Sequence, residues 1–246
     1  MKQQQPTNVL DHLSDLRKRL ITIASSFIIS LILCFLFVDH IYHFLAGQSN
    51  ERLAILGPTD ILSIYMKLAA VGAVAFTIPI AAYQVWKFVE PALTERERSV
   101  TLMYIPALFF LFIVGLGFAY YVLFPMTYSF VLGLSNGQFD LVITANDYFT
   151  FMINLCLPFG LLFELPVIVL FLSQLGIVNP HRLAKLRKPA YFVLVLVAIT
   201  ITPPDFVSDV LVIVPLLTLY EISISISRFI YRKRKQAEEA ESALNL

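Results

Sequence analysis

The residue with the clearest chemical potential is Glu164, whose carboxyl group lies within an otherwise apolar run, residues 159–171. Extended in both directions, that run is long enough to cross a bilayer. A carboxylate at such a depth is costly unless it is protonated, paired or turned toward a water-filled cavity. We therefore interpret the chain as a membrane protein and Glu164 as a position where it works. The alternative is structural, with a protonated Glu164 that hydrogen-bonds a polar side chain on a neighbouring helix.

A second candidate lies near the N-terminus, in the charged segment of residues 10–20. Its leucines follow helical spacing, which predicts a helix along the membrane interface before the chain turns into the first span. Asp15 is the candidate acid of this helix. From spacing alone, an ion pair with Arg19 one turn further on is the simpler interpretation of Asp15.

A third candidate is the acidic connection that follows the second apolar run. Glu90, Glu95 and Glu97 form a cluster there, beside basic residues, and such a cluster can receive a cationic partner. Thr94 and Glu97 also fit a capping box, in which the two side chains satisfy the backbone at a helix start. From spacing alone, the capping box is the favoured interpretation of Glu97.

Two further acids lie at the start of the last apolar run. Asp205 follows two prolines and can act as a helix cap. Asp209 is harder to explain in this way because it lies inside the run.

One apparent catalytic motif is misleading. Residues 133–137 read Gly-Leu-Ser-Asn-Gly and match the G-x-S-x-G pattern of hydrolases. That pattern requires a strand–turn–helix context, whereas here it lies in a connection between two apolar runs. Nothing ties His40 or His43 to Ser135, and no zinc-protease, P-loop or dinucleotide-binding motif occurs. We expect no catalytic residue, no metal site and no cofactor.

The composition agrees with a membrane protein. Hydrophobic residues make up 58% of the chain and charged residues 14%, with a mean hydropathy of +0.78, whereas soluble domains carry roughly 25% charged residues. The net charge of only +1 argues against nucleic-acid binding. Cys34 and Cys156 fall inside apolar runs and are interpreted as buried small side chains. The first apolar run lacks a small-residue cleavage site, so no cleavable signal peptide is expected.

The apolar runs predict an all-α polytopic membrane protein with six transmembrane helices. The predicted spans are residues 20–38, 64–89, 100–124, 148–175, 189–202 and 207–227. An amphipathic segment of residues 1–19 precedes this domain of residues 20–227, and a basic, then acidic, tail of residues 228–246 follows it. Prolines inside the spans predict kinks. These prolines are Pro79, Pro106, Pro158, Pro166 and Pro215.

The basic residues predict the orientation. All Lys and Arg residues except Arg52 and Lys67 lie in the N-terminal segment, the second-to-third connection, the fourth-to-fifth connection or the tail. By the positive-inside rule, both termini are cytoplasmic, in agreement with an even number of spans. Residues 39–63, 125–147 and 203–206 then face outward. The fifth span, of about 14 residues, reaches only about 21 Å, so we expect the bilayer to thin there or a partner to cover the helix.

Several separate segments have the sequences, in the right order, of one known family. They are His12-Leu-Ser-Asp-Leu-Arg-Lys-Arg-Leu20, Tyr83-Gln-Val-Trp86, Phe88-x-x-Pro-Ala-Leu93, Glu97-Arg98, Phe118-Ala-Tyr120, Phe124-Pro125, Phe163-Glu-Leu-Pro166, Thr202-Pro-Pro-Asp205 and Glu221-Ile222 with Ser227-Arg-Phe229. The chain resembles TatC, the multispanning core component of the twin-arginine protein export system, over nearly everything from residue 8 to residue 234.

The resemblance implies a receptor and scaffold in the bacterial inner membrane, not an enzyme. It implies that signal peptides with paired arginines, on folded cargo, bind at the cytoplasmic face through Asp15, Arg17, Phe88 and Glu97. The family commonly has Glu where this chain has Asp15, so the reach of the acid differs while its charge is kept. Arginine's planar fork matches a carboxylate in a bidentate manner and lysine's ammonium does not, which gives a physical reason for a preference for arginine.

The resemblance also implies partners within the membrane. These are TatA- and TatB-type single-span proteins in a homo- and hetero-oligomeric assembly whose transport depends on the proton gradient. The residues implied in these contacts are Glu164, Asp205 and Asp209, although the family commonly has an amide at the position of Asp209.

Two other functions are open on the sequence alone. A proton- or ion-coupled solute transporter would use Glu164, but it needs further polar groups at mid-membrane, and no internal repeat is apparent. An intramembrane protease would rest on Ser135 alone.

Overall fold

The computed structural model describes residues 9–47, 53–93, 98, 101–133, 142–202 and 206–244, which are almost entirely helical. In these ranges the β-structure is limited to a single bridge between Ala54 and Thr144. The chain divides into two compact units. The first comprises Met1–Arg52 and Gly57–Phe109, and the second comprises Leu53–Leu56 and Phe110–Leu246.

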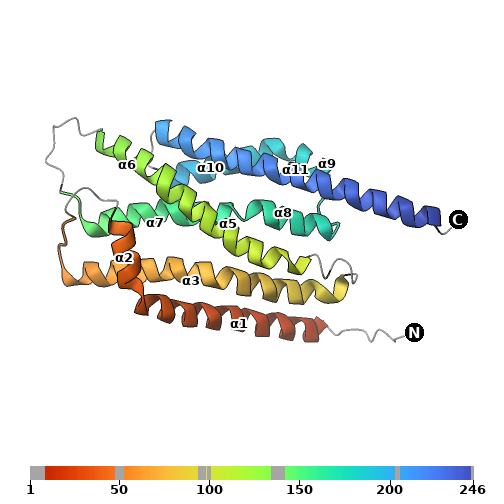
Figure 1. Cartoon of the computed structure of the whole chain (residues 1–246), viewed down its shortest axis with the longest axis horizontal. Helices are drawn as coiled ribbons and strands as arrows, with labels where there is room; N and C mark the ends of the chain where they lie inside the picture. Colours follow the sequence, from red (N-terminus) through yellow and green to blue (C-terminus); the bar gives the residue numbers. More distant parts are fainter. Residues whose placement is uncertain are drawn as a thin grey trace. The chain divides into compact units, whose positions relative to one another are not determined.

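The first unit is built on two long helices, α1 (Val9–Leu36) and α3 (Pro58–Val89), which lie side by side, with the short α2 (Val38–Ala46) packed on α3 (Figure 1). Gly72 allows the long helices to approach closely, since a Cβ atom there would lie 2.9 Å from the Cys34 sulfur. A hydrogen bond of 2.6 Å from the Tyr65 hydroxyl to Asp39 joins α3 to α2.

The end of α3 is anchored to the chain that follows it. A short 3-10 turn, η1 (Glu90–Ala92), directly follows α3. The buried Trp86 indole nitrogen donates to the Thr101 hydroxyl over 2.9 Å. This bond ties the last turn of α3 to the residues just before α5.

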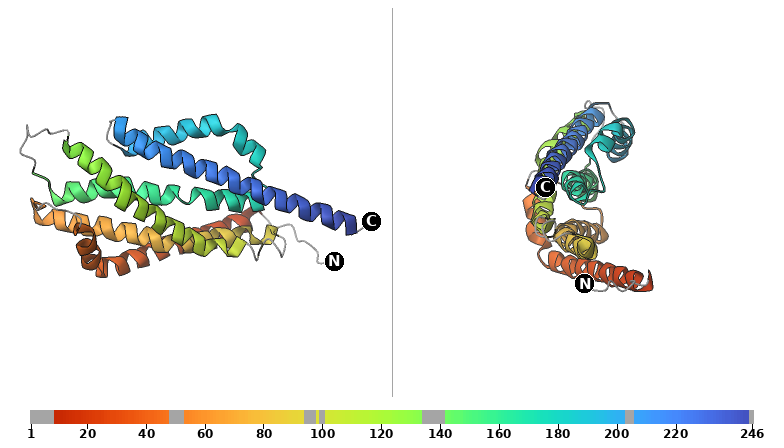
Figure 2. Two further views of the ribbon diagram at one scale, coloured as in Figure 1. Left: turned by 45° about the horizontal axis from the view of Figure 1, so that its top comes forward. Right: turned by 90° about the vertical axis from the view of Figure 1, so that its right-hand side faces the viewer.

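The second unit contains the remaining helices. They are most of α5 (Tyr104–Phe118), then η2 (Ala119–Leu123), α6 (Phe124–Gly133), α7 (Ala145–Leu162), α8 (Leu165–Gln174), α9 (Pro180–Lys185), α10 (Arg187–Ile201) and α11 (Phe206–Leu244). The long α11 packs against α8, α9 and α10. It continues as one helix to the end of the described chain (Figure 2).

Five segments are long and apolar enough to cross a membrane, by length and composition, among the residues that the structure describes. They are Ser14–Leu36, Pro58–Val89, Tyr104–Gly133, Ala145–Gln174 and Phe206–Arg232. They correspond to the first four and the last of the predicted spans. The predicted fifth span is present as α10, but at 15 residues it is shorter than the others. Whether α10 crosses the bilayer, and on which side the termini lie, remain predictions.

The N-terminal segment differs from the expected arrangement. We expected the chain to turn between an interfacial helix and the first span near residue 20, whereas α1 runs without interruption from Val9 to Leu36. The physical reason is the absence of any Gly or Pro in this range. Nothing therefore ends the helix, even though its exposed face changes from charged to apolar along its length.

The third span also continues further than expected. We predicted its end at Phe124, but the helix extends to Gly133 through the π-helical turn η2. Pro125 has no N–H to give to the preceding turn. The chain adapts locally, since the Phe124 amide donates to the Ala119 carbonyl, five residues back. A further helix, α2, occupies part of the connection of residues 39–63 that we expected to lie between the first two spans.

Candidate functional site

In the first unit, the described site residues gather around Arg19. Asp15 and Arg19 are one turn apart on α1, and Gln84 and Phe88 are one turn apart on α3. One Arg19 guanidinium nitrogen, Nη2, donates to Asp15 Oδ2 over 2.9 Å, and the other, Nη1, donates to the Gln84 backbone carbonyl over 3.4 Å. The guanidinium carbon lies 5.9 Å from the centre of the Phe88 ring. The expected Asp15–Arg19 ion pair is therefore confirmed, and it also reaches a second helix.

The remaining residues of the predicted signal-peptide site are not part of this cluster in the described chain. Arg17 is exposed on α1. Glu97 lies outside the described residues, together with Thr94 and Glu95, so the capping box remains a prediction. Glu90 forms an ion pair with Arg98. The structure thus brings Asp15 and Phe88 together through Arg19, a contact that the spacing of these residues in the sequence does not predict.

Glu164 lies in the second unit, between α7 and α8. Its side chain is 5% exposed, and neither carboxylate oxygen has a hydrogen-bond partner in the described chain. Pro166 explains the helix break, because a proline in the first turn of α8 cannot donate back to α7. The Glu164 amide instead bonds the Leu161 carbonyl, three residues back, over 3.2 Å. A buried carboxyl group without a hydrogen-bond partner in the described chain thus lies at the break between α7 and α8.

The helices around this break are in close contact. A Cβ atom on Gly115 of α5 would lie 2.8 Å from the Phe163 side chain and 3.0 Å from the Gly160 backbone. Two glycines thus allow α5 to press against the end of α7, directly before Glu164. This packing leaves no room near Phe163 for a larger side chain from α5.

Asp209 has a partner within the chain. The hydroxyl of the buried Thr202 donates to Asp209 Oδ1 over 2.6 Å, which joins the end of α10 to the first turn of α11. This bond accounts for an acid that helix capping did not explain. Asp205 lies outside the described residues.

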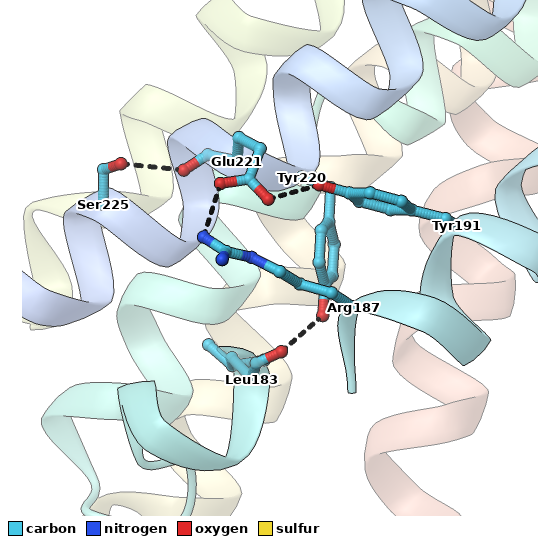
Figure 3. A network of polar contacts seen from close by, with 6 residues as sticks. All are labelled: Leu183, Arg187, Tyr191, Tyr220, Glu221 and Ser225. Atoms are coloured by element: carbon cyan, nitrogen blue, oxygen red, sulfur yellow. Dashed lines mark hydrogen bonds and ion pairs between the residues drawn. The ribbon is translucent and has the colours of Figure 1, made fainter. Parts of the chain in front are cut away.

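A polar network that the sequence analysis did not predict joins α9, α10 and α11 (Figure 3). Arg187 donates to Glu221 over 2.8 Å, and the Tyr191 hydroxyl donates to the other Glu221 oxygen. The Tyr220 hydroxyl donates to the Leu183 carbonyl over 3.0 Å. Glu221 was present in one of the resembling segments, but spacing gave no indication of partners 30 and 34 residues away. The network fixes the short α9–α10 hairpin to α11.

Comparison with known proteins identifies the family. The family model described as Sec-independent protein translocase protein (TatC) matches residues 11–215. The chain belongs to the TatC family. It is 53% identical over 240 residues to the Sec-independent protein translocase protein TatCd of Bacillus subtilis, a match that covers 98% of this chain and 99% of that one. It is 44% identical to TatCy of the same organism, with 95% and 94% covered.

Solved structures of the TatC family agree with this result. A crystal structure described as the twin-arginine translocase receptor TatC matches with a TM-score of 0.76 at 31% identity, covering 89% of this chain and 98% of that one. A structure of the receptor in the detergent DDM matches with a TM-score of 0.78. This chain is thus a protein-translocase component of the TatC family, and a multi-pass protein of the bacterial cytoplasmic membrane.

Proposed function

We propose that this chain is the receptor for signal peptides with paired arginines, and that it binds them at the cytoplasmic face through Asp15, Arg17, Phe88 and Glu97. The observation that carries the proposal is the Arg19 contact. Asp15 and Phe88 are distant in sequence, yet both interact with one guanidinium group. An acid, an aromatic ring and a backbone carbonyl are the groups that recognise an arginine.

We also propose that TatA- and TatB-type single-span proteins dock on the second unit, through Glu164 and the outer ends of α10 and α11 near Asp205 and Asp209. The support is the state of Glu164, a buried carboxyl group without a partner in the described chain. A polar group on a docked helix would satisfy it, since polar residues join helices in membranes. The short α10 offers a second reason for a covering partner.

The proposed orientation places both termini in the cytoplasm. Its test uses a variant without native cysteines and with one cysteine at position 135 or 242, labelled in intact cells by an impermeant reagent. We expect labelling at 135 and none at 242. Labelling at 242 from outside would overturn the orientation.

The receptor function is tested at Glu97. Losing one partner of a desolvated charge pair costs about 2–5 kcal/mol, or more than tenfold in affinity, whereas losing a helix cap costs about 0.5–2 kcal/mol of stability. Glu97→Gln keeps much of the capping ability and removes the charge. We expect it to weaken crosslinking of an Arg-Arg peptide, with thermal stability nearly unchanged. Undiminished binding by Glu97→Gln combined with Asp15→Asn would remove both acids from the site.

The transporter alternative receives less support. A coupled transporter needs several polar groups that converge on the buried acid and define a path. No described residue hydrogen-bonds the Glu164 carboxylate. A test of exported cargo in cells that lack the chain separates the two functions, because only the receptor's loss stops export of folded proteins.

A further inference from the structure

The cluster of Asp15, Gln84 and Phe88, which offers groups that bind arginine, already contains an arginine of this chain, Arg19. The Arg19 side chain is only 15% exposed, and its guanidinium contacts all three groups. Two of these groups, Asp15 and Phe88, are ones that the proposed function offers to an arginine of the signal peptide. Two guanidinium groups cannot both lie over the same face of Phe88, and a second one at Asp15 would stand beside a group of like charge.

We propose that Arg19 is a resident competitor of the signal peptide, which a peptide arginine must displace from Asp15 and Phe88 in order to bind. This inference rests on the proposed receptor function and adds a property of the same site. Arg19 then sets how tightly a peptide must interact with the site in order to bind at all.

The contacts of Arg19 are suited to displacement. Its bond to the Gln84 carbonyl is long, at 3.4 Å, and its Nε atom is buried without a hydrogen-bond partner in the described chain. Asp15 is 52% exposed, so water and an incoming cation can reach it. A partly exposed ion pair between residues four apart on a helix is weak. The guanidinium of Arg19 is therefore held in place, but not all of its N–H groups have a hydrogen-bond acceptor in the described chain, which makes it easier to displace.

Competition affects every cationic ligand by the same factor. When the binding-competent state is only partly populated, the apparent affinity falls in proportion to that population, whatever the ligand. Arg19 therefore does not change the ratio of affinities for arginine and lysine peptides. It lowers both affinities. The lysine peptide has the weaker intrinsic affinity, because an ammonium group fits the site less well, and so it no longer binds at the concentrations at which the arginine peptide still binds.

The exchange also predicts an unusual salt dependence. In the wild type, a peptide arginine replaces Arg19 at Asp15, so one ion pair is broken for each one formed there. In a variant without Arg19, the peptide forms a new ion pair at that acid. Salt weakens peptide binding more when binding forms a new ion pair than when it only replaces one ion pair by another. Binding to the variant should decline more steeply as salt is added.

The experiment measures binding of fluorescent signal peptides with Arg-Arg, Lys-Lys or Ala-Ala to the full chain in detergent, by anisotropy, over a range of salt. The variants are Arg19→Gln and Arg19→Lys, with thermal unfolding recorded for each. Lys18→Gln is the matched control because Lys18 is an exposed neighbour on α1 and carries the same charge. It corrects for the general effect of one positive charge fewer.

We expect Arg19→Gln to raise the affinity for Arg-Arg and Lys-Lys peptides by the same factor, about three- to tenfold beyond the Lys18→Gln control. Arg19→Lys should give a smaller rise, since an ammonium group is a poorer competitor. An affinity that is unchanged, lowered or raised only as much as in the control overturns the inference. If the wild type does not prefer Arg-Arg over Ala-Ala peptides at all, the proposed function itself fails, and the two failures are thus distinguishable.

Discussion

Asp15 in the first unit and Glu164 in the second are both carboxylates on helices of membrane-spanning character, yet their surroundings are opposite. Asp15 is half exposed and bonded to an arginine of its own helix. Glu164 is buried, and its oxygens have no partner in the described chain. A ligand of Asp15 must therefore compete with Arg19, whereas a ligand of Glu164 finds the carboxyl group without a hydrogen-bond partner from the described chain.

The local sequence explains this difference. Four residues beyond Asp15 stands Arg19, within reach on the same helix face. The residues four before and four after Glu164 are Gly160 and Ile168, which offer no polar side chain. A partner for Glu164 has to come from another helix or another protein, or else the acid stays protonated. Polar groups inside a membrane are therefore best judged by whether their own helix can satisfy them.

The largest effect is expected at Glu164. If its role is to receive a partner, Glu164→Ala should reduce export by more than tenfold, in line with the cost of a lost partner in a desolvated pair, about 2–5 kcal/mol. Glu164→Gln should be milder because an amide still forms hydrogen bonds. Export of a signal-peptide reporter and co-purification of TatA- and TatB-type proteins measure the effect. Equal export by Glu164→Ala and wild type would reduce Glu164 to a packing residue.

A companion measurement at Glu164 separates function from folding. A buried polar group without a partner lowers stability by about 1–3 kcal/mol. The isolated chain with Glu164→Met, a side chain of similar length, should be as stable as the wild type or more stable by that amount, even though export falls. A clear loss of thermal stability would mean that Glu164 has a partner inside the chain.

The second effect tests the packing that encloses Glu164. Gly115→Ala would place a methyl group 2.8 Å from Phe163 and 3.0 Å from the Gly160 backbone, and overpacking of this kind costs about 1–3 kcal/mol. The control is Gly117→Ala on the same helix, where nothing but its chain neighbours and the helix's own backbone lies within 4 Å of the added Cβ. This change should stabilise the helix by up to about 1 kcal/mol. Unfolding of both variants in detergent is compared, and equal stabilities would contradict the tight crossing of α5 and α7.

The sequence predicted the elements of this fold better than their contacts. Apolar runs predicted the positions of the helices, and i,i+4 spacing predicted the Asp15–Arg19 pair, because both depend on residues that are close in the chain. The contact of Arg19 with Phe88 depends on the register between α1 and α3. That register is set by packing at positions such as Gly72 and Cys34, and no local pattern reveals it.

The wrongly predicted helix ends have local causes, which the spacing of apolar residues does not reveal. The charged segment of residues 10–20 suggested a helix separate from the first span, but a change in polarity does not end a helix when no Gly or Pro follows. The third span was predicted to end at Phe124, although the helix continues past Pro125 through a π-helical turn. Pro166 did carry the signal for the break beside Glu164, which was predicted only as a kink.

The third effect concerns Glu221, an acid that differs from both Asp15 and Glu164 because two side chains of α10 bond to it. Both bonds are only partly buried, so we expect Glu221→Gln to cost about 1 kcal/mol of unfolding free energy. Tyr191→Phe, which removes one hydroxyl and keeps the ring, should cost less. Thermal unfolding compares them, and cysteine crosslinking between α10 and α11 checks whether the hairpin has loosened. A larger loss for Tyr191→Phe would mean that the tyrosine, not the ion pair, fixes the hairpin.

The smallest effect is the most informative about Asp15. Because the Asp15–Arg19 pair is partly exposed, a double-mutant cycle with Asp15→Asn and Arg19→Gln should give a coupling free energy of about 0.3–0.5 kcal/mol. About 1 M salt should remove most of it, since the screening length is then about 3 Å. A coupling above about 2 kcal/mol, insensitive to salt, is the magnitude of a desolvated pair. In that case displacing Arg19 would lower the apparent affinity about thirtyfold or more, beyond the three- to tenfold expected of a resident competitor, and Asp15 would be a satisfied structural acid.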